Sequence, residues 1–128
     1  MKEILFLVIA GGLGTLGRYG LSGLAQRLLG DAFPFGTLLV NFLGSLLIGF
    51  IMQLGLNSDL IPRSFRIAIT LGFLGAFTTF STFSYETVKY IEDGAWTSAS
   101  INIAVNVGIC IFATLIGMAI GRLVLRGA

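Results

Sequence analysis

The stretch Thr70-Leu-Gly-Phe-Leu-Gly-Ala-Phe-Thr-Thr-Phe-Ser-Thr-Phe-Ser84 decides how this chain folds, because it combines an apolar span with a dense run of hydroxyl groups. Gly72 and Gly75 loosen a helix, and the five serine and threonine residues between positions 78 and 84 compete for backbone hydrogen bonds. The alternative is that these hydroxyls only bond back to their own helix and join it to its neighbours. Five hydroxyls among seven residues favour a helix break between Gly75 and Ser81.

The composition around this stretch predicts a membrane protein. The chain has 128 residues, of which 55% are hydrophobic and 11% charged, and its mean hydropathy is +0.95. A soluble domain carries about 25% charged residues, so lipid must solvate most of this surface. The charges divide the chain into four apolar stretches, at about 4–25, 35–56, 67–90 and 97–123. We therefore predict an all-α membrane protein with one domain over 1–128, four transmembrane helices and a third helix broken at mid-membrane.

Several function classes lack the residues that they need. The net charge is only +2 and the basic residues are scattered, which does not suit a nucleic-acid partner. The chain has no histidine, and its single cysteine, Cys110, can form neither an intrachain disulfide nor a metal cluster. No Ser-His-Asp set or carboxylate pair lies within the apolar stretches, so we do not expect an enzyme.

The same stretches also lack a central acidic residue, because Glu3 and Glu86 lie at their ends. A proton-coupled exporter of cationic drugs needs a carboxylate within the membrane. A neutral path rich in hydrogen-bond donors suits a small anion better. A small four-helix multidrug or small-solute transporter stays open as the alternative, and a purely structural membrane subunit would give the hydroxyl run no purpose.

The orientation signal in the loops is weak. Four spans place the N-terminus, the second loop and the C-terminus on one side, with only about two more lysines and arginines than the other side. Either the N-terminus is cytoplasmic with a faint signal, or the chain inserts both ways and pairs antiparallel; charge alone slightly favours the first. Glycines at helical spacing, such as Gly117 and Gly121, predict close helix contacts and a homo-oligomer.

Polar side chains elsewhere could meet the hydroxyl run. Asn41 lies in the second stretch, and Asn106, Cys110 and Thr114 share one face of the fourth. Each of them alone would usually form an interhelical hydrogen bond. Together with the third stretch they would form a track of neutral donors.

Three motifs resemble those of one family. Gly72-Phe-Leu-Gly-Ala-Phe-Thr-Thr-Phe-Ser-Thr-Phe83 resembles the third-helix signature of the Fluc (CrcB) fluoride channels, and positions 11–19 and 36–44 resemble their first- and second-helix motifs. The resemblance implies a fluoride-selective channel that gives passive fluoride efflux across the bacterial plasma (inner) membrane. It also implies an antiparallel, dual-topology homodimer with two pathways, which favours dual insertion over the single orientation.

The resemblance also implies roles for particular residues. The fluoride pathway would be lined by Asn41, Phe80, Phe83, Ser81, Thr82, Thr37, Asn106 and Thr114. The backbone carbonyls of Gly75 and Thr78 would hold a structural Na⁺ on the dimer axis. Arg18 would serve structure or attract anions in the vestibule. Cys110 departs from the serine of several relatives, and because a thiol is a weak donor the pathway there would be less polar.

Overall fold

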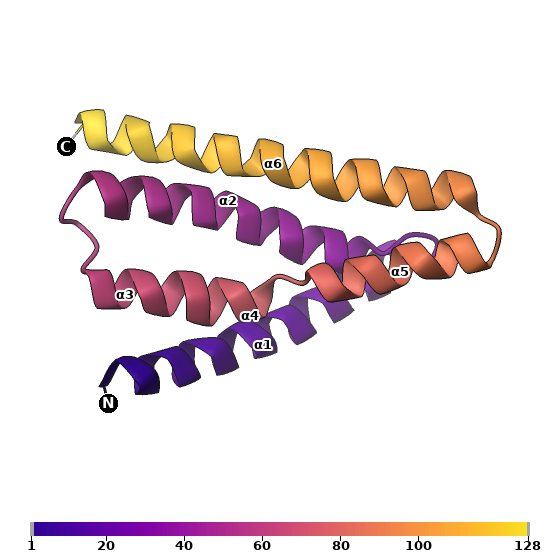
Figure 1. Ribbon diagram of the computed structural model, residues 1–128, viewed down its shortest axis with the longest axis horizontal. Helices are drawn as coiled ribbons and strands as arrows, with labels where there is room; N and C mark the ends of the chain where they lie inside the picture. The colour runs from indigo at the N-terminus through magenta and orange to yellow at the C-terminus, as the bar shows by residue number, and fades with distance from the viewer. Residues whose placement is uncertain (1, 128) are drawn as a thin grey trace.

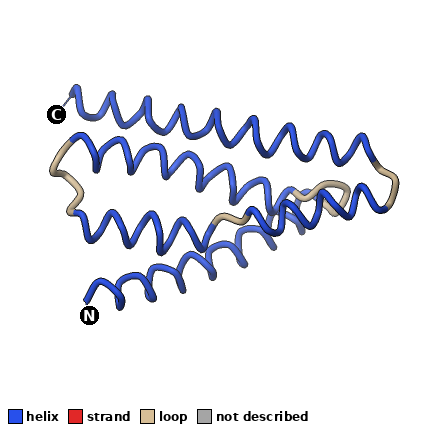
Figure 2. Tube along the Cα trace, in the orientation of Figure 1, coloured by secondary structure: helices blue, strands red, loops and turns tan. Residues whose placement is uncertain are grey.

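The computed structural model describes residues 2–127 and consists of helices joined by short connections (Figures 1 and 2). The first, second and last rods are α1 (Lys2–Leu29), α2 (Phe35–Asn57) and α6 (Trp96–Gly127). The third rod consists of α3 (Arg63–Ile67), a π-helix η1 (Ala68–Leu74), α4 (Gly75–Phe77) and α5 (Phe80–Glu92). Each rod is long and apolar enough to cross a bilayer. The predicted all-α class with four long apolar helices is therefore confirmed, and the protein is a multi-pass membrane protein.

The helices extend somewhat beyond the predicted apolar stretches. For example, α1 continues to Leu29 although the sequence suggested an end near Ala25. Gly30 and Gly94 follow α1 and α5 closely and have φ angles of +85° and +71°, a conformation that glycine adopts without strain. Both chain ends lie at the same end of the bundle in Figure 1, as four antiparallel spans require.

Two pairs of rods pack closely. α2 lies along α6 for most of its length (Figure 1), and glycines let the backbones approach. A Cβ atom on Gly49 would collide with the Thr114 carbonyl group, and one on Gly117 would collide with the Leu46 carbonyl oxygen. On the other side of the bundle, Gly14 of α1 lies against the backbone of Phe73 in η1. Close backbone approach replaces the hydrophobic effect as the main source of helix association in lipid.

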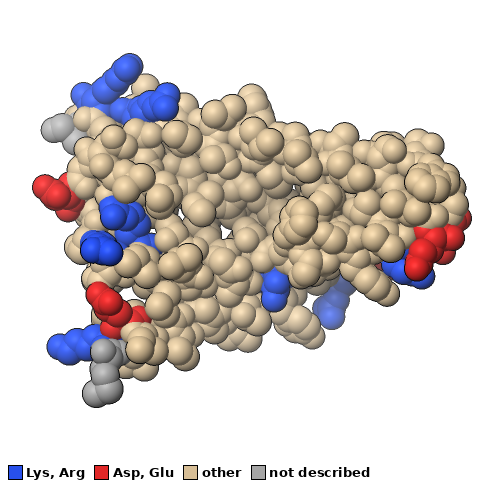
Figure 3. Space-filling model, viewed as in Figure 1, with Lys and Arg blue, Asp and Glu red and all other residues tan. Residues whose placement is uncertain are grey.

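The outer surface fits a lipid environment. Charged side chains gather mainly toward the two ends of the rods, and apart from basic groups along the lower edge the surface between them is uncharged in this view (Figure 3). Most large apolar side chains of α1 are exposed; Ile4, Val8 and Leu16, for example, are each more than 60% accessible. Gly12, Gly20 and Gly23 have no other part of residues 2–127 within contact of their Cβ positions. This face of α1 is therefore covered by lipid or by another protein surface.

The third rod changes its geometry twice. In η1 the N–H of Gly75 reaches the carbonyl of Thr70, five residues back, as in a π-helix. Thr78 and Thr79 then adopt extended dihedral angles, with ψ of 161° and 114°, before α5 begins at Phe80. The sequence did not predict the π-helix. The two extended residues redirect the chain, so that α3–α4 and α5 are separate segments of one rod (Figure 2).

Candidate functional site

The extended residues Thr78 and Thr79 are held by a side chain from another helix. The amide of Asn41, on α2, accepts a hydrogen bond from the Thr79 N–H at 2.8 Å and donates to the Thr79 carbonyl at 3.0 Å. The Thr79 hydroxyl in turn accepts from the Thr82 N–H at 3.1 Å and thereby caps α5. Thr79 is only 7% exposed, so these partners replace water for a buried backbone.

This arrangement releases two backbone carbonyls. In a continuous helix the Gly75 carbonyl would accept from the Thr79 N–H, and the Thr78 carbonyl from the Thr82 N–H. Both N–H groups are bound elsewhere, to Asn41 and to the Thr79 hydroxyl. Among residues 2–127, the Gly75 and Thr78 carbonyls accept no hydrogen bond. These oxygens are therefore available to another ligand, and they are the two that the sequence resemblance assigns to Na⁺.

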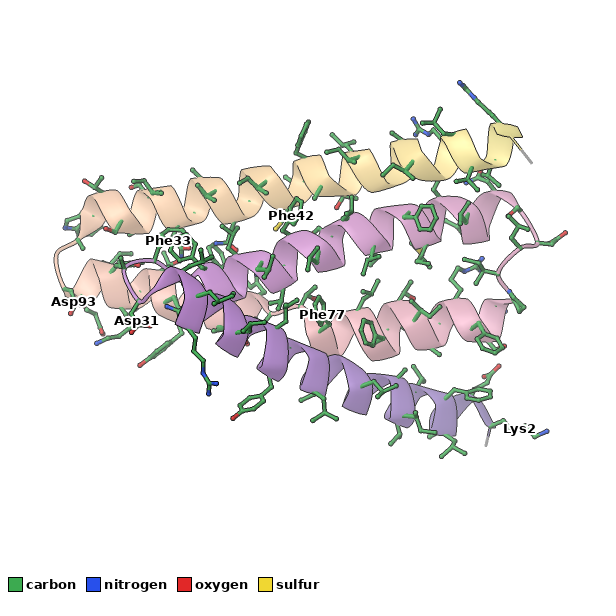
Figure 4. The ribbon with its side chains drawn as sticks, turned by 180° about the vertical axis from the view of Figure 1, so that it is seen from behind. Lys2, Asp31, Phe33, Phe42, Phe77 and Asp93 are labelled. Carbon is green, nitrogen blue, oxygen red and sulfur yellow. The ribbon has the colours of Figure 1, made fainter. Side chains whose placement is uncertain are left out.

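A cavity of about 400 Å³ lies beside the interruption, between α2, the third rod and α6. Its lining contains six of the predicted residues, Asn41, Gly75, Thr78, Phe80, Phe83 and Asn106. The rings of Phe80 and Phe83 lie 5.4 Å apart and are tilted by 57°. None of the residues that line this cavity is charged. Phe77 at the end of α4 and Phe42 on α2, which are labelled in Figure 4, do not line this cavity.

A series of neighbouring polar side chains leads from Asn41 on α2 to Asn106 and Asn102 on α6. Asn41 Nδ2 lies 3.4 Å from Asn106 Oδ1, and Asn106 Nδ2 donates to Asn102 Oδ1 at 2.9 Å. Asn102 Nδ2 donates to the Thr87 hydroxyl at 2.9 Å, and that hydroxyl donates to the Phe83 carbonyl at 2.8 Å. Asn102 is fully buried and Asn106 is 4% exposed. The neutral polar groups of three rods thus form one connected network.

A second cavity, of about 330 Å³, lies on the α1 side of the interruption. It is lined by three more predicted residues, Arg18, Thr37 and Thr82, together with Thr15, Tyr19, Ser22, Val40 and Thr79. Thr79 is the residue that lines both cavities. The Thr37 hydroxyl donates to Glu86 Oε1 at 2.7 Å, and Glu86 Oε2 is buried without a partner among the described residues.

The remaining two predicted pathway residues lie apart from the larger cavity. Ser81 is exposed, and its hydroxyl is 3.3 Å from that of Thr79. Thr114 borders a separate depression along α2 and α6, and its hydroxyl donates to the carbonyls of Ser45 and Cys110. Within one chain, Thr114 therefore contributes to helix packing, whereas Cys110 lines the larger cavity.

Sequence reasoning did not single out four polar residues of the site. Thr79 was part of the hydroxyl run, but its position between two cavities depends on the fold. Asn102 precedes Asn106 by one helical turn, so the pair could have been recognised as a buried amide stripe. Thr87 and Glu86 lie beyond the signature stretch, and Glu86 was interpreted only as an end residue.

Comparison with known proteins adds independent information. Residues 5–118 match the family described as CrcB-like protein, Camphor Resistance (CrcB). The fluoride-specific ion channel FluC of Dehalococcoides mccartyi is 48% identical over 123 residues, which cover 96% of this chain and 95% of the relative. The FluC proteins of Geobacter sulfurreducens and Pelobacter propionicus are 47% and 46% identical, over 95% and 99% of this chain and 98% of each relative.

Proposed function

This chain belongs to the CrcB-like family, and from that premise we propose that it is a fluoride-selective channel for passive fluoride efflux across the bacterial plasma membrane. The observation that carries the proposal is the uncharged cavity beside Thr78 and Thr79, lined by amides and phenylalanine rings. We place this interruption at mid-membrane depth, where a non-helical backbone is tolerated if it borders a polar cavity. The relatives are named ion channels, and an ion channel is not an enzyme.

The Asn41 amide supplies the donor that the anion meets. One of its hydrogens is held at 3.0 Å by the Thr79 carbonyl, whereas the other faces Asn106 Oδ1 at 3.4 Å. Because 3.4 Å exceeds the usual range for N–H···O bonds, this second hydrogen is the one that a fluoride ion would take. The hydroxyls of Thr37, Ser81, Thr82 and Thr114 extend the polar path on either side. Arg18, beside the second cavity, attracts anions toward it or stabilises the fold.

Phe80 and Phe83 contribute through their ring edges. The edge of an aromatic ring carries positive partial charge, so two tilted rings can contact a small anion without binding it as tightly as a fixed cation would. Fluoride is strongly hydrated, and a narrow, neutral slot must replace its water with several weak donors. Chloride is larger and gains less from the same donors. This difference is the proposed basis of selectivity.

The open faces of the chain support an antiparallel, dual-topology homodimer with two pathways. Phe80 lines the larger cavity and yet is 76% exposed within one chain. A second copy would cover this ring and close the cavity, and the glycines on the outer face of α1 would let another helix approach closely. The weak charge asymmetry between the loops fits insertion in both orientations.

A structural Na⁺ on the dimer axis would fit the carbonyls that the interruption releases. Gly75 and Thr78 each offer one carbonyl oxygen that lacks its helical partner, and two copies would offer four. Alkali cations prefer hard oxygen ligands, and a bound cation would also favour an anion in the adjoining pathways. The ion would hold the two interruptions together, while the protein side chains bind the anion.

The test is ion efflux from liposomes that contain the purified protein, followed with fluoride and chloride electrodes. The proposal predicts fast fluoride release and negligible chloride release. A monodisperse, folded protein that releases neither ion, or both at similar rates, would refute it. Phe80→Ile should stop fluoride release without changing the oligomeric state, whereas a conservative change near the end of α6, Leu123→Ile, should have no effect.

A further inference from the structure

The buried amides of α6 donate hydrogen bonds in one order, from Asn106 to Asn102 and from Asn102 to Thr87. The side-chain nitrogen of Asn106 donates to Asn102, at 2.9 Å from its Oδ1 and 3.2 Å from its backbone oxygen. The amide oxygen of Asn106 therefore faces Asn41. Asn102 continues the series by donating to Thr87 on α5. Asn106, Asn102 and Thr87 thus donate one after another, and the series ends at the Phe83 carbonyl.

The Thr79 backbone fixes the direction of the Asn41 amide, and two oxygens of Asn102 fix the direction of the Asn106 amide. Asn41 cannot turn its amide over, because its nitrogen would then face the Thr79 N–H and its oxygen the Thr79 carbonyl. Asn106 cannot turn over either, because its oxygen would then face two oxygens of Asn102. Reversing one amide would leave buried polar groups unpaired, which is costly in a low-dielectric interior. The series is satisfied in one orientation only.

The consequence for the cavity is that Asn106 presents an acceptor there instead of a donor. The Asn41 nitrogen then has one weak contact, at 3.4 Å, whereas the Asn106 nitrogen donates to Asn102. An anion in the cavity would meet a single exchangeable amide hydrogen. Fewer strong donors favour release of the ion, and conduction needs binding that is weak enough for the ion to leave.

We propose that Asn102 is a positioning residue, which holds Asn106 with its oxygen toward Asn41 and so sets the donor that the pathway offers to fluoride. Thr87 supports Asn102 from α5. Neither Asn102 nor Thr87 lines the larger cavity, so both act through Asn106 and Asn41. The proposal rests on the proposed channel function for its effect on flux, but the amide series itself can be tested without any transport.

The first experiment is NMR of protein labelled with ¹⁵N only in asparagine side chains. The chain has four asparagines, Asn41, Asn57, Asn102 and Asn106, so four NH₂ pairs are expected. Asn102→Leu should shift the NH₂ signals of Asn41 and Asn106 and speed their exchange with solvent. Asn57 bonds only to the Gln53 carbonyl at the far end of α2, and its signals should stay unchanged. Unchanged signals of Asn41 and Asn106 in a folded Asn102→Leu protein would overturn the proposal.

The second experiment is a double-mutant cycle on fluoride efflux. Asn102→Leu should slow efflux about tenfold, as expected when one hydrogen bond in the series is lost, while the matched control Asn57→Leu should leave it unchanged. In an Asn106→Leu background the series is already cut, so Asn102→Leu should then add nothing. An equal loss in both backgrounds would show that Asn102 acts independently of Asn106 and would overturn the proposal.

A smaller substitution repeats both tests with less change to the packing. Thr87→Val removes only the hydroxyl that accepts from Asn102, and it should shift the Asn41 NH₂ signals and slow efflux in the same direction. Ser84→Ala is its control, because Ser84 on the same helix bonds back to the Phe80 carbonyl outside the series. If the unmodified protein releases no fluoride, the proposed function fails, while the NMR signals still decide the amide series.

Discussion

Asn41 holds the backbone of Thr79 at both of its polar groups, accepting from the N–H at 2.8 Å and donating to the carbonyl at 3.0 Å. A side chain of α2 thus replaces the helical partners that Thr79 loses where the third rod is interrupted. Because the same amide faces the cavity, Asn41 serves both the fold and the proposed pathway.

Asn41→Ala should therefore lower stability as well as flux. Each buried backbone group left without a partner costs about 1–3 kcal/mol, so thermal unfolding in detergent should begin at a clearly lower temperature. Fluoride efflux should be lost. Asn57→Ala, which removes an exposed amide, should change neither property. An unchanged unfolding temperature for Asn41→Ala would show that its hydrogen bonds to the Thr79 backbone do not stabilise the fold.

Substitutions of Phe80 and Phe83, the two phenylalanines of the cavity, should lower the stability of the protein by different amounts. Phe80 is 76% exposed and Phe83 is 7% exposed in the chain. Replacing either with isoleucine removes a ring edge and should reduce fluoride efflux strongly. Phe83→Ile should also cost on the order of 1 kcal/mol because it reshapes a packed interior. Chemical unfolding should show a smaller decrease in the free energy of unfolding for Phe80→Ile, because that ring is covered mainly by the second copy and not by the interior of its own chain; the reverse order would contradict this placement.

Gly117→Ala should disrupt the contact between α2 and α6. The added methyl group would collide with the Leu46 carbonyl oxygen and the Phe50 nitrogen, which are backbone atoms and cannot turn aside. Gly108→Ala on the same helix is the matched control, since no atom lies within 4 Å of its Cβ position. Yield of monodisperse protein and unfolding temperature should fall for position 117 only. Equal yields and equal unfolding temperatures for the two variants would exclude the close contact between Gly117 and the backbone of α2.

Removal of Na⁺ should weaken the assembly if the released carbonyls bind it. Dialysis into N-methyl-glucamine chloride should lower the unfolding temperature and slow fluoride efflux, and return of Na⁺ should restore both. The larger organic cation cannot enter a site formed by carbonyl oxygens of Gly75 and Thr78. Identical unfolding curves and efflux rates with and without Na⁺ would rule out the structural ion.

Cys110 provides a chemical probe of the cavity. Its thiol is partly exposed and lines the space beside Asn41 and Phe83. A methanethiosulfonate reagent that reaches it should block fluoride efflux, because the attached group would fill part of a cavity of about 400 Å³. Cys110→Ser should conduct fluoride and resist the reagent. Because Cys110 is the single cysteine, unchanged fluoride efflux after the reagent has labelled the thiol would contradict its place in the cavity.

Much of the architecture followed from the sequence alone. Low charge and long apolar stretches determine that lipid is the solvent, and a chain in lipid must satisfy its backbone within helices. The motif at 72–83 resembled one family, and the comparisons confirmed that membership. The same stretch contains the two extended threonines, since glycine and clustered hydroxyls weaken a helix locally. These properties depend on composition or on neighbours in the chain.

The tertiary structure decided how the polar groups are paired. The Asn41 amide meets Thr79 across 38 positions of sequence and Asn106 across 65. No local pattern specifies which end of an amide faces which partner, because that depends on where three rods place their donors and acceptors. The distant contact between Asn41 and Thr79 also releases the Gly75 carbonyl, whereas the local cap by the Thr79 hydroxyl releases the Thr78 carbonyl. The sequence determined which polar groups enter the membrane, and packing of the rods determined which of them remain available to an ion.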